Sequence, residues 1–561
     1  MYINRFLLLT VTGCLLFNTG FTQFFQQQKT PLQDSLRGSV TRERAWWDVI
    51  RYDITVEPNI NNKTITGKTD ITYKVTDNTV SFMQIDLQAP LEVDSVYLNN
   101  FTKVDVVKRD VDLFYLLMPP QTKGKKNKLT IYYHGKPLEA VRPPWQGGFI
   151  WETDSLGRPW ISVACQRLGA SVWFPCKDHQ SDEPDEGATI TMIVSDTLTG
   201  VGNGRLVEQK KLSEGKASFK WAVRNPINNY NIVPYIGKYV NTTREYKGEK
   251  GRLTIDLWSL DYNREKMTTH ALPDVLRTLN AMEHWFGPYP FYNDGYKLVE
   301  APHLGMEHQS AVAYGNDYVN GYRGKDISSS GHGLNFDFII VHESGHEWFG
   351  NSITAGDIAD MWIHESFTNL SEALFTEKFY GKEAAIDYVV GIRGNILNDK
   401  PIIGKYGMNE EGSGDMYYKG ANMLQNIRTT MNDENKFRNM LREMNKVFYH
   451  KIIDNAQVQQ FINQYSEINF SKTFEQYLTT TQIPTFEFYF SPDDKKVFYR
   501  YINAVEGFDM PLVLVKDGIT IRLLPGFEWQ SYDIDSDKVK EIFSTNFIER
   551  KYYLNAKEIE D

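Results

Sequence analysis

The sequence predicts a multidomain α+β protein, and three observations support this fold class. The chain has 561 residues, whereas a single hydrophobic core stops growing at about 250–300 residues. From about residue 46 to residue 240, apolar residues alternate with polar ones, a pattern typical of β-strands. Apolar residues then recur at helical spacing up to about residue 484, and β alternation returns after it. We therefore expect an N-terminal antiparallel β domain, a mostly helical domain and a small C-terminal β-sandwich domain.

The composition and charge argue against a nucleic-acid-binding protein. Hydrophobic residues make up 41% and charged residues 24% of the chain, as in ordinary globular proteins. The formal net charge is −10, and the sequence has no extended cluster of basic residues. A nucleic-acid-binding protein usually shows a basic face. We therefore expect no nucleic-acid partner.

The N-terminus has the pattern of a secretory signal peptide over residues 1–22. Arg5 precedes an apolar run over residues 6–17, which is shorter than the roughly 20 residues that span a bilayer. Small residues, Gly20 and Thr22, precede a cleavage point before Gln23. We expect an exported protein, periplasmic or extracellular, with no integral membrane span.

The cysteines leave two questions open. Residues 11–14, ending in Cys14, loosely resemble a lipoprotein box, but the residues after Cys14 stay apolar, which favours cleavage near residue 22. The mature chain would keep Cys165 and Cys176. An exported protein can pair two cysteines, yet two in so long a chain form no disulfide framework. A disulfide and two buried thiols are both compatible with the sequence.

Strand patterns fill the first predicted domain, residues 23–243. Tyr52, Ile54 and Val56 alternate with polar residues, and similar runs recur up to about residue 240. Turn-forming residues such as Pro58-Asn59 interrupt these runs, as expected for a many-stranded antiparallel domain.

Helical patterns dominate the second predicted domain, residues 244–484. A helix is expected over residues 272–286, because apolar residues recur there every three to four positions and Gly287-Pro288 follows. A Gly- and Ser-rich stretch over residues 321–333 predicts a loop. Further helices are expected over residues 335–349, 361–380, 417–431, 434–448 and 455–466. From residue 485 to residue 561, alternation (Phe486, Phe488, Phe490) predicts the C-terminal β domain.

The helix predicted over residues 335–349 carries the pattern H-E-x-x-H. His342 and His346 are four residues apart, so both imidazoles project from one face and can bind one ion. Glu343 lies about 100° from His342 around the helix, flanking the same face. That position suits a general base better than a third metal ligand.

A third ligand is expected from the next helix. Eighteen residues, 347–364, separate His346 from Glu365, which lies near the start of the helix predicted over residues 361–380. If the two helices pack antiparallel, Glu365 faces the histidines. Two imidazoles and one carboxylate are a common ligand set for catalytic zinc. His364, His179, His303 and His332 have no ligand spacing, and we assign none of them to the metal.

This combined motif resembles the gluzincin zinc aminopeptidases of the aminopeptidase N type, which are related to the leukotriene-hydrolase-type enzymes. The resemblance extends from about Trp46 to the terminal strands. It implies a thermolysin-like catalytic domain that binds one zinc ion per chain. About 75 residues follow Pro484, which is enough for one small β domain. We therefore expect the large C-terminal helical domain of the family to be absent.

The resemblance implies a site for the substrate's free amine. Gly305-Met306-Glu307-His308 is similar to the family's G-x-M-E-N motif, in which the glutamate binds the α-ammonium group. His308 replaces the asparagine, which puts the role of that asparagine in doubt but keeps the acid. Gln166 resembles a glutamine or glutamate of the β domain that binds the same amine.

Two further residues are implied by resemblance. Tyr417, in Tyr417-Tyr418-Lys419-Gly420, resembles the family tyrosine that stabilises the oxyanion, although Tyr418 replaces a glutamate and a shift of one residue stays open. Glu372, seven residues after Glu365, resembles a glutamate that supports the metal site, and its alternative is a solvated helix residue.

The implied function is a zinc-dependent aminopeptidase that hydrolyses N-terminal residues from peptides by metal-activated water. Glu343 is its general base and Tyr417 its oxyanion stabiliser, and its partners are peptides with a free N-terminus. The alternatives are a zinc endopeptidase, an epoxide hydrolase of the same superfamily, and a catalytically silent peptide-binding relative. The sequence predicts no particular oligomeric state.

Overall fold

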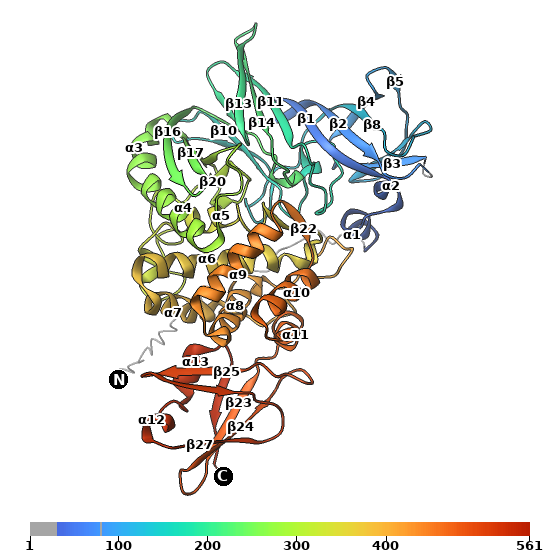
Figure 1. The fold of residues 1–561 in the computed structure, drawn as a ribbon. Coiled ribbons are helices and arrows are strands. Elements are labelled where there is room, and N and C mark those ends of the chain that lie inside the picture. The colour runs from blue at the N-terminus through green and yellow to red at the C-terminus, as the bar shows by residue number, and fades with distance from the viewer. Residues whose placement is uncertain (1–30, 79–80, 561) are drawn as a thin grey trace, which may run out of the picture.

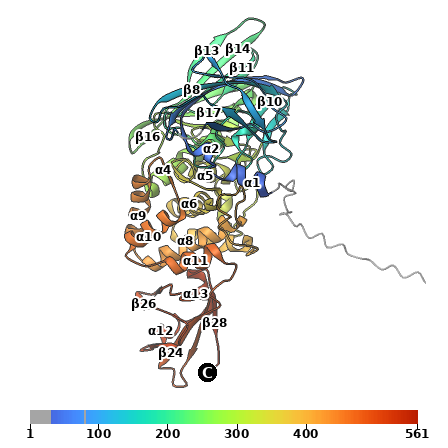
Figure 2. The ribbon, with the colours of Figure 1, turned by 90° about the vertical axis from the view of Figure 1, so that its right-hand side faces the viewer.

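The computed structural model describes residues 31–78 and 81–560. The predicted signal peptide and Cys14 lie outside the described residues. Three regions follow one another along the long axis of the molecule: a β-rich region, a layer of helices, and a smaller β-rich region (Figures 1 and 2). This arrangement confirms the predicted α+β fold class.

The N-terminal β domain contains three sheets, preceded by the short helices α1 (Pro31–Gly38) and α2 (Arg42–Ala45). The largest sheet has the order β13 (Arg205–Lys211), β14 (Lys216–Val223), β11 (Ala188–Ser195), β1 (Trp47–Asn59), β2 (Thr64–Val75), β8 (Lys126–Gly135), β4 (Glu92–Leu98) and β5 (Thr102–Lys103). The second has the order β12 (Thr199–Val201), β15 (Tyr235–Gly237), β10 (Pro159–Ala164) and β9 (Gly148–Thr153). The third has the order β3 (Phe82–Asp86), β7 (Leu113–Leu117) and β6 (Val106–Arg109).

Period-2 patterning forms these strands. In β1, Tyr52, Ile54 and Val56 are buried while the residues between them are partly exposed. Successive side chains of a strand point to opposite faces, so this alternation places one face of the large sheet on the core. The sheet is mainly antiparallel, with one parallel pair between β1 and β11.

A further five-stranded sheet joins the β domain to the helices. Its order is β16 (Tyr239–Gly248), β17 (Gly251–Leu260), β18 (Tyr296–Glu300), β20 (Val312–Tyr314) and β19 (Gly305–Met306). The boundary predicted between residues 243 and 244 falls within β16, because strand alternation runs from one sheet into the next without a marked break in the sequence.

The helical region agrees closely with the helices predicted from apolar spacing. The crossover between the parallel strands β17 and β18 contains α3 (Arg264–Lys266) and α4 (Leu272–Phe286). The remaining elements are α5 (Phe338–Gly345), β21 (Ile353–Ala355), α6 (Trp362–Tyr380), α7 (Lys382–Gly391), α8 (Tyr418–Met431), α9 (Glu434–Val447), β22 (Lys451–Ile453), α10 (Asn455–Ser466) and α11 (Ser471–Thr479). The first fifteen residues of α6 are all buried, so this helix is the centre of the region.

The C-terminal region is built on a four-stranded sheet and a hairpin. The sheet has the order β27 (Gln530–Asp533), β24 (Lys496–Ile502), β23 (Thr485–Phe490) and β28 (Asn555–Glu558). The hairpin is β25 (Leu512–Lys516) and β26 (Ile519–Leu523), and two short helices follow, α12 (Asp537–Lys540) and α13 (Thr545–Lys551). One continuous hydrophobic core extends from Leu253 in β17 through the helices to Leu554 beside β28. The C-terminal strands therefore complete the core of the helical region.

Two sequence questions are answered by the described residues. Cys165 and Cys176 are both buried free thiols, and burial raises the pKa of each well above its usual value. Among the described helices, none combines the length and the apolar character that crossing a bilayer requires.

Candidate functional site

A close approach of two helices brings the predicted metal ligands together. His342 lies on α5 and His346 directly follows this helix, while Glu365 lies in the first turn of α6. Gly345 makes the approach possible, because a Cβ atom there would lie only 2.7 Å from Oγ of Ser371 on α6. The glycine inside H-E-x-x-H thus allows the packing that the third ligand needs.

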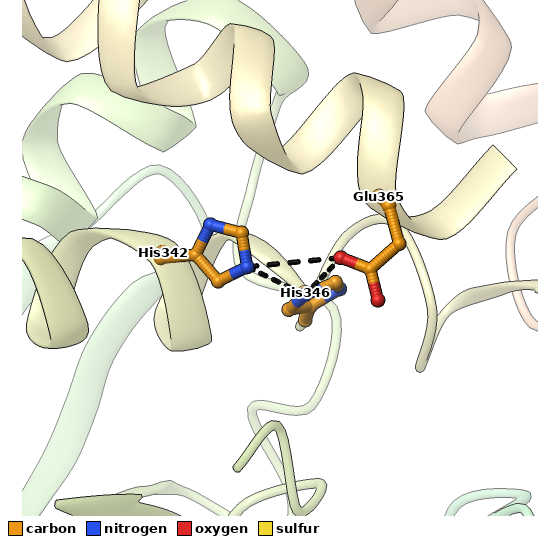
Figure 3. A group of neighbouring side chains, drawn as sticks. All are labelled: His342, His346 and Glu365. Atoms are coloured by element: carbon orange, nitrogen blue, oxygen red, sulfur yellow. Dashed lines mark hydrogen bonds and ion pairs between the residues drawn. The ribbon is translucent and has the colours of Figure 1, made fainter. Parts of the chain in front are cut away.

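The three side chains converge on one point (Figure 3). Nε2 of His342 and Nε2 of His346 are 3.3 Å apart. Oε2 of Glu365 lies 3.7 Å from Nε2 of His342 and 3.4 Å from Nε2 of His346. Ligands bound tetrahedrally to zinc at about 2.0–2.2 Å would lie about 3.3–3.6 Å from one another. The spacing of these three atoms therefore fits one zinc ion.

The chemistry of Glu365 also fits a cation. The residue is 2% exposed, and the two imidazoles are the only ion-pair partners of its Oε2 among the described residues. A buried carboxylate is energetically costly unless it is paired with a positive charge. A metal ion bound between Glu365 and the two imidazoles would remove this cost.

Each imidazole is oriented from behind. Nδ1 of His342 lies 2.7 Å from Oε1 of Glu372, and Nδ1 of His346 lies 2.9 Å from the carbonyl oxygen of Phe349. Both partners are acceptors, so each ring carries its proton on Nδ1 and offers Nε2 to the metal. Glu372 is fully buried, so it is not a solvated helix residue, and its carboxylate contacts the ring of His342.

Glu372 is itself held by two further residues. Its Oε2 accepts a hydrogen bond of 2.6 Å from Oη of Tyr388, and its Oε1 accepts one of 2.9 Å from Nδ2 of Asn369. Removal of such a supporting group typically costs 10–100-fold in metal affinity.

We expect Glu372→Gln to weaken zinc binding by about 10–100-fold, because the amide no longer supports the charge and orientation of His342. Competition with a chromophoric zinc chelator measures this affinity. Glu377→Gln, one turn further along α6, is the control. An unchanged zinc affinity in Glu372→Gln would contradict the supporting role.

In the metal-free protein, neighbouring carboxylates raise the pKa of both histidine ligands. Burial acts to lower the pKa of His342, but the carboxylates of Glu365 and Glu372 raise it well above the usual value. Burial also acts to lower the pKa of His346, but the charge of Glu365 raises it, and the net pKa lies above its usual value. The pKa of Glu365 lies far below its usual value, because the charge of His346 outweighs the effect of burial.

Zinc uptake should therefore release protons. Imidazoles must be neutral to bind a metal, and the raised pKa values favour the protonated form of both rings in the metal-free protein. We expect about one to two protons per zinc ion and an apparent affinity that falls as the pH is lowered from about 8 to about 6. Calorimetric titration in two buffers of different ionisation enthalpy measures the proton count. Uptake without proton release at pH 7 would contradict this prediction.

Glu343 adjoins the metal ligands but points at the neighbouring sheet. A Cβ atom at Gly305 would lie 2.7 Å from Oε1 of Glu343, so only glycine leaves space for this carboxylate. Burial raises the pKa of Glu343 to about 7, against the lowering effect of His342 and His346. A carboxyl group with such a pKa can accept and return a proton at neutral pH.

Glu307 directly follows β19 and lies close to the base and a metal ligand. Its carboxylate comes within 4.8 Å of ligand atoms of Glu343 and His346. Oε1 of Glu307 accepts hydrogen bonds from Nε2 of Gln166 at 2.6 Å and from Oη of Tyr230 at 3.0 Å. Glu307 is 3% exposed, and burial raises its pKa. The first of these hydrogen bonds joins Gln166 of the β domain to Glu307.

Gly305 and Met306 form β19, the last strand of the five-stranded sheet. The side chain of Met306 is buried in the core of the β domain, so only its backbone is available to a ligand. An edge strand offers unpaired N–H and C=O groups to an extended peptide. These two residues can therefore contact a substrate through the main chain alone.

Tyr417 directly precedes α8 and lies against a metal ligand. Its ring stacks against that of His342, with centroids 6.0 Å apart and planes at 26°. Tyr418 lies behind it, with ring centroids 6.3 Å apart. Of the two neighbouring tyrosines, the geometry favours Tyr417 as the one that faces the metal ligands.

His364, which the sequence analysis did not assign to the metal, and His308 both have other hydrogen-bond partners. Nε2 of His364 accepts a hydrogen bond of 2.8 Å from the backbone N–H of Ala355, and burial lowers its pKa to about 3. Nδ1 of His308, which replaces the family asparagine, lies 2.5 Å from Oη of Tyr235. His308 therefore packs against the β domain, where burial lowers its pKa well below the usual value.

Sequence reasoning missed three residues that hold the predicted ones. These are Tyr230, which binds Glu307, and Tyr388 and Asn369, which bind Glu372. Asn369 lies three residues before Glu372 on α6, so helical spacing could have indicated it. Tyr230 and Tyr388 reach the site from distant segments, and no spacing in the sequence marks them.

Two family descriptions match the chain. Residues 49–230 match the Peptidase M1 N-terminal domain, and residues 270–477 match the Peptidase family M1 domain. Among curated proteins, the chain is 23% identical over 425 residues to an alanine/arginine aminopeptidase of Saccharomyces cerevisiae. It is 24% identical over 414 residues to an aminopeptidase N of Lactobacillus helveticus. These alignments cover 71% and 68% of this chain, but 47% and 45% of the two relatives. The chain thus spans about half the length of the curated relatives that it matches.

Solved structures share the fold. An M1 zinc metallopeptidase from Deinococcus radiodurans superposes with a TM-score of 0.65 at 19% identity, covering 78% of this chain and 95% of that one. A mutant of that enzyme bound to a Tyr-Ser-Ala substrate gives a TM-score of 0.63 at 18% identity, with the same coverage.

Proposed function

Because the chain belongs to peptidase family M1, of the gluzincin aminopeptidase N type, we propose that it is a zinc aminopeptidase acting on peptides with a free N-terminus. One observation carries this proposal. The carboxylate of Glu307 lies within 4.8 Å of both Glu343 and His346. An acid that can bind an ammonium group therefore adjoins both the proposed base and a metal ligand.

One zinc ion per chain would be held by His342, His346 and Glu365. When bound, zinc acts as a Lewis acid that acidifies water and polarises a carbonyl group. The supporting hydrogen bonds to Glu372 and Phe349 orient the two imidazoles for this role.

The peptide would add to the free edge of β19. Main-chain hydrogen bonds to Gly305 would hold the segment around the scissile bond in an extended form beside Glu343. Glu307, assisted by Gln166, would bind the α-ammonium through a charge-assisted hydrogen bond. The first peptide bond would then lie next to the base, as positioning catalysis requires.

Glu343 moves the proton. It would take a proton from the attacking water and deliver it to the leaving amine. Its pKa of about 7 suits both steps near neutral pH. The hydroxyl of Tyr417 would donate to the carbonyl oxygen as it becomes negative, a contact of the type worth about 10²–10³ in rate.

Two other activities fit the site less well. An endopeptidase must accommodate a chain that continues on both sides of the scissile bond, and in the proposed binding mode Glu307 and Gln166 would block the N-terminal side. A catalytically silent peptide-binding relative would need none of the base, the metal ligands or the tyrosine, yet all of them converge here.

The signal-peptide pattern of residues 1–22 supports the further proposal that the enzyme is exported. An exported aminopeptidase would act on peptides in the periplasm or outside the cell. Fractionation of cells that produce the full chain tests this, and a protein confined to the cytoplasm would contradict it.

A panel of aminoacyl fluorogenic amides, each beside its N-acetylated form, tests the proposed activity. Cleavage of the free amines alone, blocked by a zinc chelator, is the expected result. Equal cleavage of the acetylated forms would point to an endopeptidase, and cleavage of neither set would favour a binding protein.

Glu307→Ala should raise KM for free-amine substrates by at least about 100-fold, because a charge-assisted contact worth about 3 kcal/mol is lost. Steady-state kinetics on one aminoacyl amide measure the change. Glu300→Ala, which alters a buried acid of β18 in the same sheet, is the matched control. A KM within threefold of the wild-type value would contradict the amine-binding role of Glu307.

A further inference from the structure

Three segments meet next to Gln166 and Tyr417, at a place that we call the junction. The first is α1, and the second is the turn after β10, residues 165–169, which carries Gln166. The third is the loop over residues 399–416, which ends directly before Tyr417. The junction therefore connects the proposed amine-binding side of the site to the proposed oxyanion-stabilising side.

An ion pair crosses the junction. Nη1 of Arg167 in the β domain lies 2.6 Å from Oε1 of Glu411 in the loop before Tyr417. The two side chains are 31% and 20% exposed, so the pair is partly shielded from water. Oε2 of Glu411 is buried and accepts no hydrogen bond from the described residues. Glu411 thus depends on Arg167 for its charge compensation.

The same loop is tied to α1. The backbone N–H of Asn409 donates to the carbonyl oxygen of Asp34 at 3.1 Å, and Nδ2 of Asn409 donates to the carbonyl oxygen of Arg167 at 3.4 Å. A Cβ atom at Gly38 would lie 2.1 Å from the carbonyl carbon of Met408. α1 therefore rests directly on the loop backbone.

The backbone of Arg167 aims its side chain. Its φ angle of 65° lies in the left-handed region, which is uncommon for a residue other than glycine. The guanidinium of Arg37 fixes the turn by donating to the carbonyl oxygen of Leu168. The turn directs Gln166 towards Glu307 and directs the adjacent Arg167 towards the loop.

Tyr417 lies between the loop and α8, and its carbonyl oxygen accepts a hydrogen bond of 3.0 Å from the backbone N–H of Ala421. Its hydroxyl makes no hydrogen bond with the described residues, and its ring is held by stacking on His342. The carbonyl oxygen of the preceding Met416 accepts a hydrogen bond of 2.7 Å from Oγ of Ser366. The loop has further ties to the helical region, because the backbone N–H groups of Ile402, Gly404 and Gly407 donate to Leu478, Ala359 and Asp357. The ties described above bind residues 408–411 of the loop to α1 and to the β domain.

The charge of Arg167 faces the catalytic groups as well. Burial acts to lower its pKa, but Glu411, Tyr417 and Glu365 raise it. The guanidinium therefore stays charged beside these groups.

We propose that Arg167 is a positioning residue whose ion pair with Glu411 fixes Tyr417 relative to Gln166 and Glu307. This inference rests on the proposed aminopeptidase function. A substrate bound through its amine has its scissile carbonyl at a fixed distance from Glu307. The hydroxyl of Tyr417, which would donate to the oxyanion, must therefore also be held at a fixed position relative to Glu307. Misplacement by about 1 Å can cost about 10²-fold in rate.

The test separates positioning from binding. Arg167→Ala and Glu411→Gln should each lower kcat by about 10–100-fold, with KM within about threefold of wild type. In a Tyr417→Phe background the same changes should cost less than threefold, because residues that act as a unit are not additive. Arg167→Lys, which keeps the charge, should recover part of kcat. Arg550→Ala, which breaks a 2.6 Å ion pair with Asp387 outside the site, is the control.

Two kinetic results would overturn the inference. An increase in KM at unchanged kcat would mean that Arg167 contacts the substrate. Losses that multiply with that of Tyr417→Phe would mean that Arg167 acts independently of the tyrosine. If Arg167→Ala fails to fold, Glu411→Gln and Arg167→Lys carry the same comparison.

A readout without turnover keeps this inference distinct from the proposed function. Hydrogen–deuterium exchange over residues 404–417 should rise in Arg167→Ala and Glu411→Gln, and stay unchanged in Arg550→Ala. If the wild-type protein cleaves no peptide, the proposed function fails while the exchange result still tests the tie. Unchanged exchange in all variants would overturn it.

Discussion

Glu343→Gln should lower kcat by about 10³-fold while the protein keeps its zinc. A positioned general base contributes about 10²–10⁴ in rate, and glutamine has the size of glutamate but cannot accept the proton. The carboxylate is not one of the three converging ligands, so metal content should stay at the wild-type level. Single-turnover kinetics and zinc analysis of the same sample measure both quantities.

The controls for this variant exclude indirect effects. The change replaces a buried acid by an uncharged amide, so stability should not fall, and thermal unfolding with zinc bound checks this. Glu372→Gln provides the opposite pattern, with weaker zinc binding but near-normal turnover once zinc is saturating. Turnover of Glu343→Gln within tenfold of wild type would contradict the role of Glu343 as the general base.

Loss of a metal ligand should have an effect at least as large. His346→Ala removes one of three ligands and leaves Oε2 of Glu365 with one imidazole neighbour in place of two. We expect the variant to be purified without zinc and to lose at least about 10³ in kcat/KM, since metal catalysis supplies several kcal/mol of transition-state stabilisation. Zinc analysis and aminoacyl amide hydrolysis measure the loss.

A neighbouring histidine provides the matched control. His364 is also buried, but its Nε2 accepts a backbone hydrogen bond from Ala355. His364→Asn can keep an acceptor there, so zinc content should be unchanged. Chelation of the wild type should abolish activity, and added zinc should restore it. A His346→Ala variant that retains zinc and activity would refute the ligand set.

The helices were predictable where local signals set both ends. α10 begins after Asp454, whose side chain and that of Gln457 form a capping box, and α4 ends at Gly287 with φ of 96°. The limits of domains were less accessible. β16 and β17 form a hairpin in the five-stranded sheet, yet their alternation resembles that of the β domain before them. Which sheet a strand joins depends on pairing that its own sequence does not encode.

The metal site was predictable because its information is local. His342 and His346 share one helix face, and Glu365 follows on the next helix. Residues that reach the site through the fold were not predictable in this way. Tyr230 comes from a different domain than Glu307, and Arg167 meets Glu411 across 244 positions of the chain, from 167 to 411. Such contacts exist only after the domains have packed.

The continuous core from Leu253 to Leu554 has a consequence for the order of events during synthesis. The chain that carries the last metal ligand, Glu365, is made 189 residues before Leu554, counting from 365 to 554. At about 5–20 residues per second, this interval lasts roughly 10–40 s. For that time the helices around the ligands lack part of their apolar partners. We therefore expect tight zinc capture only after the strands around Leu554 have emerged.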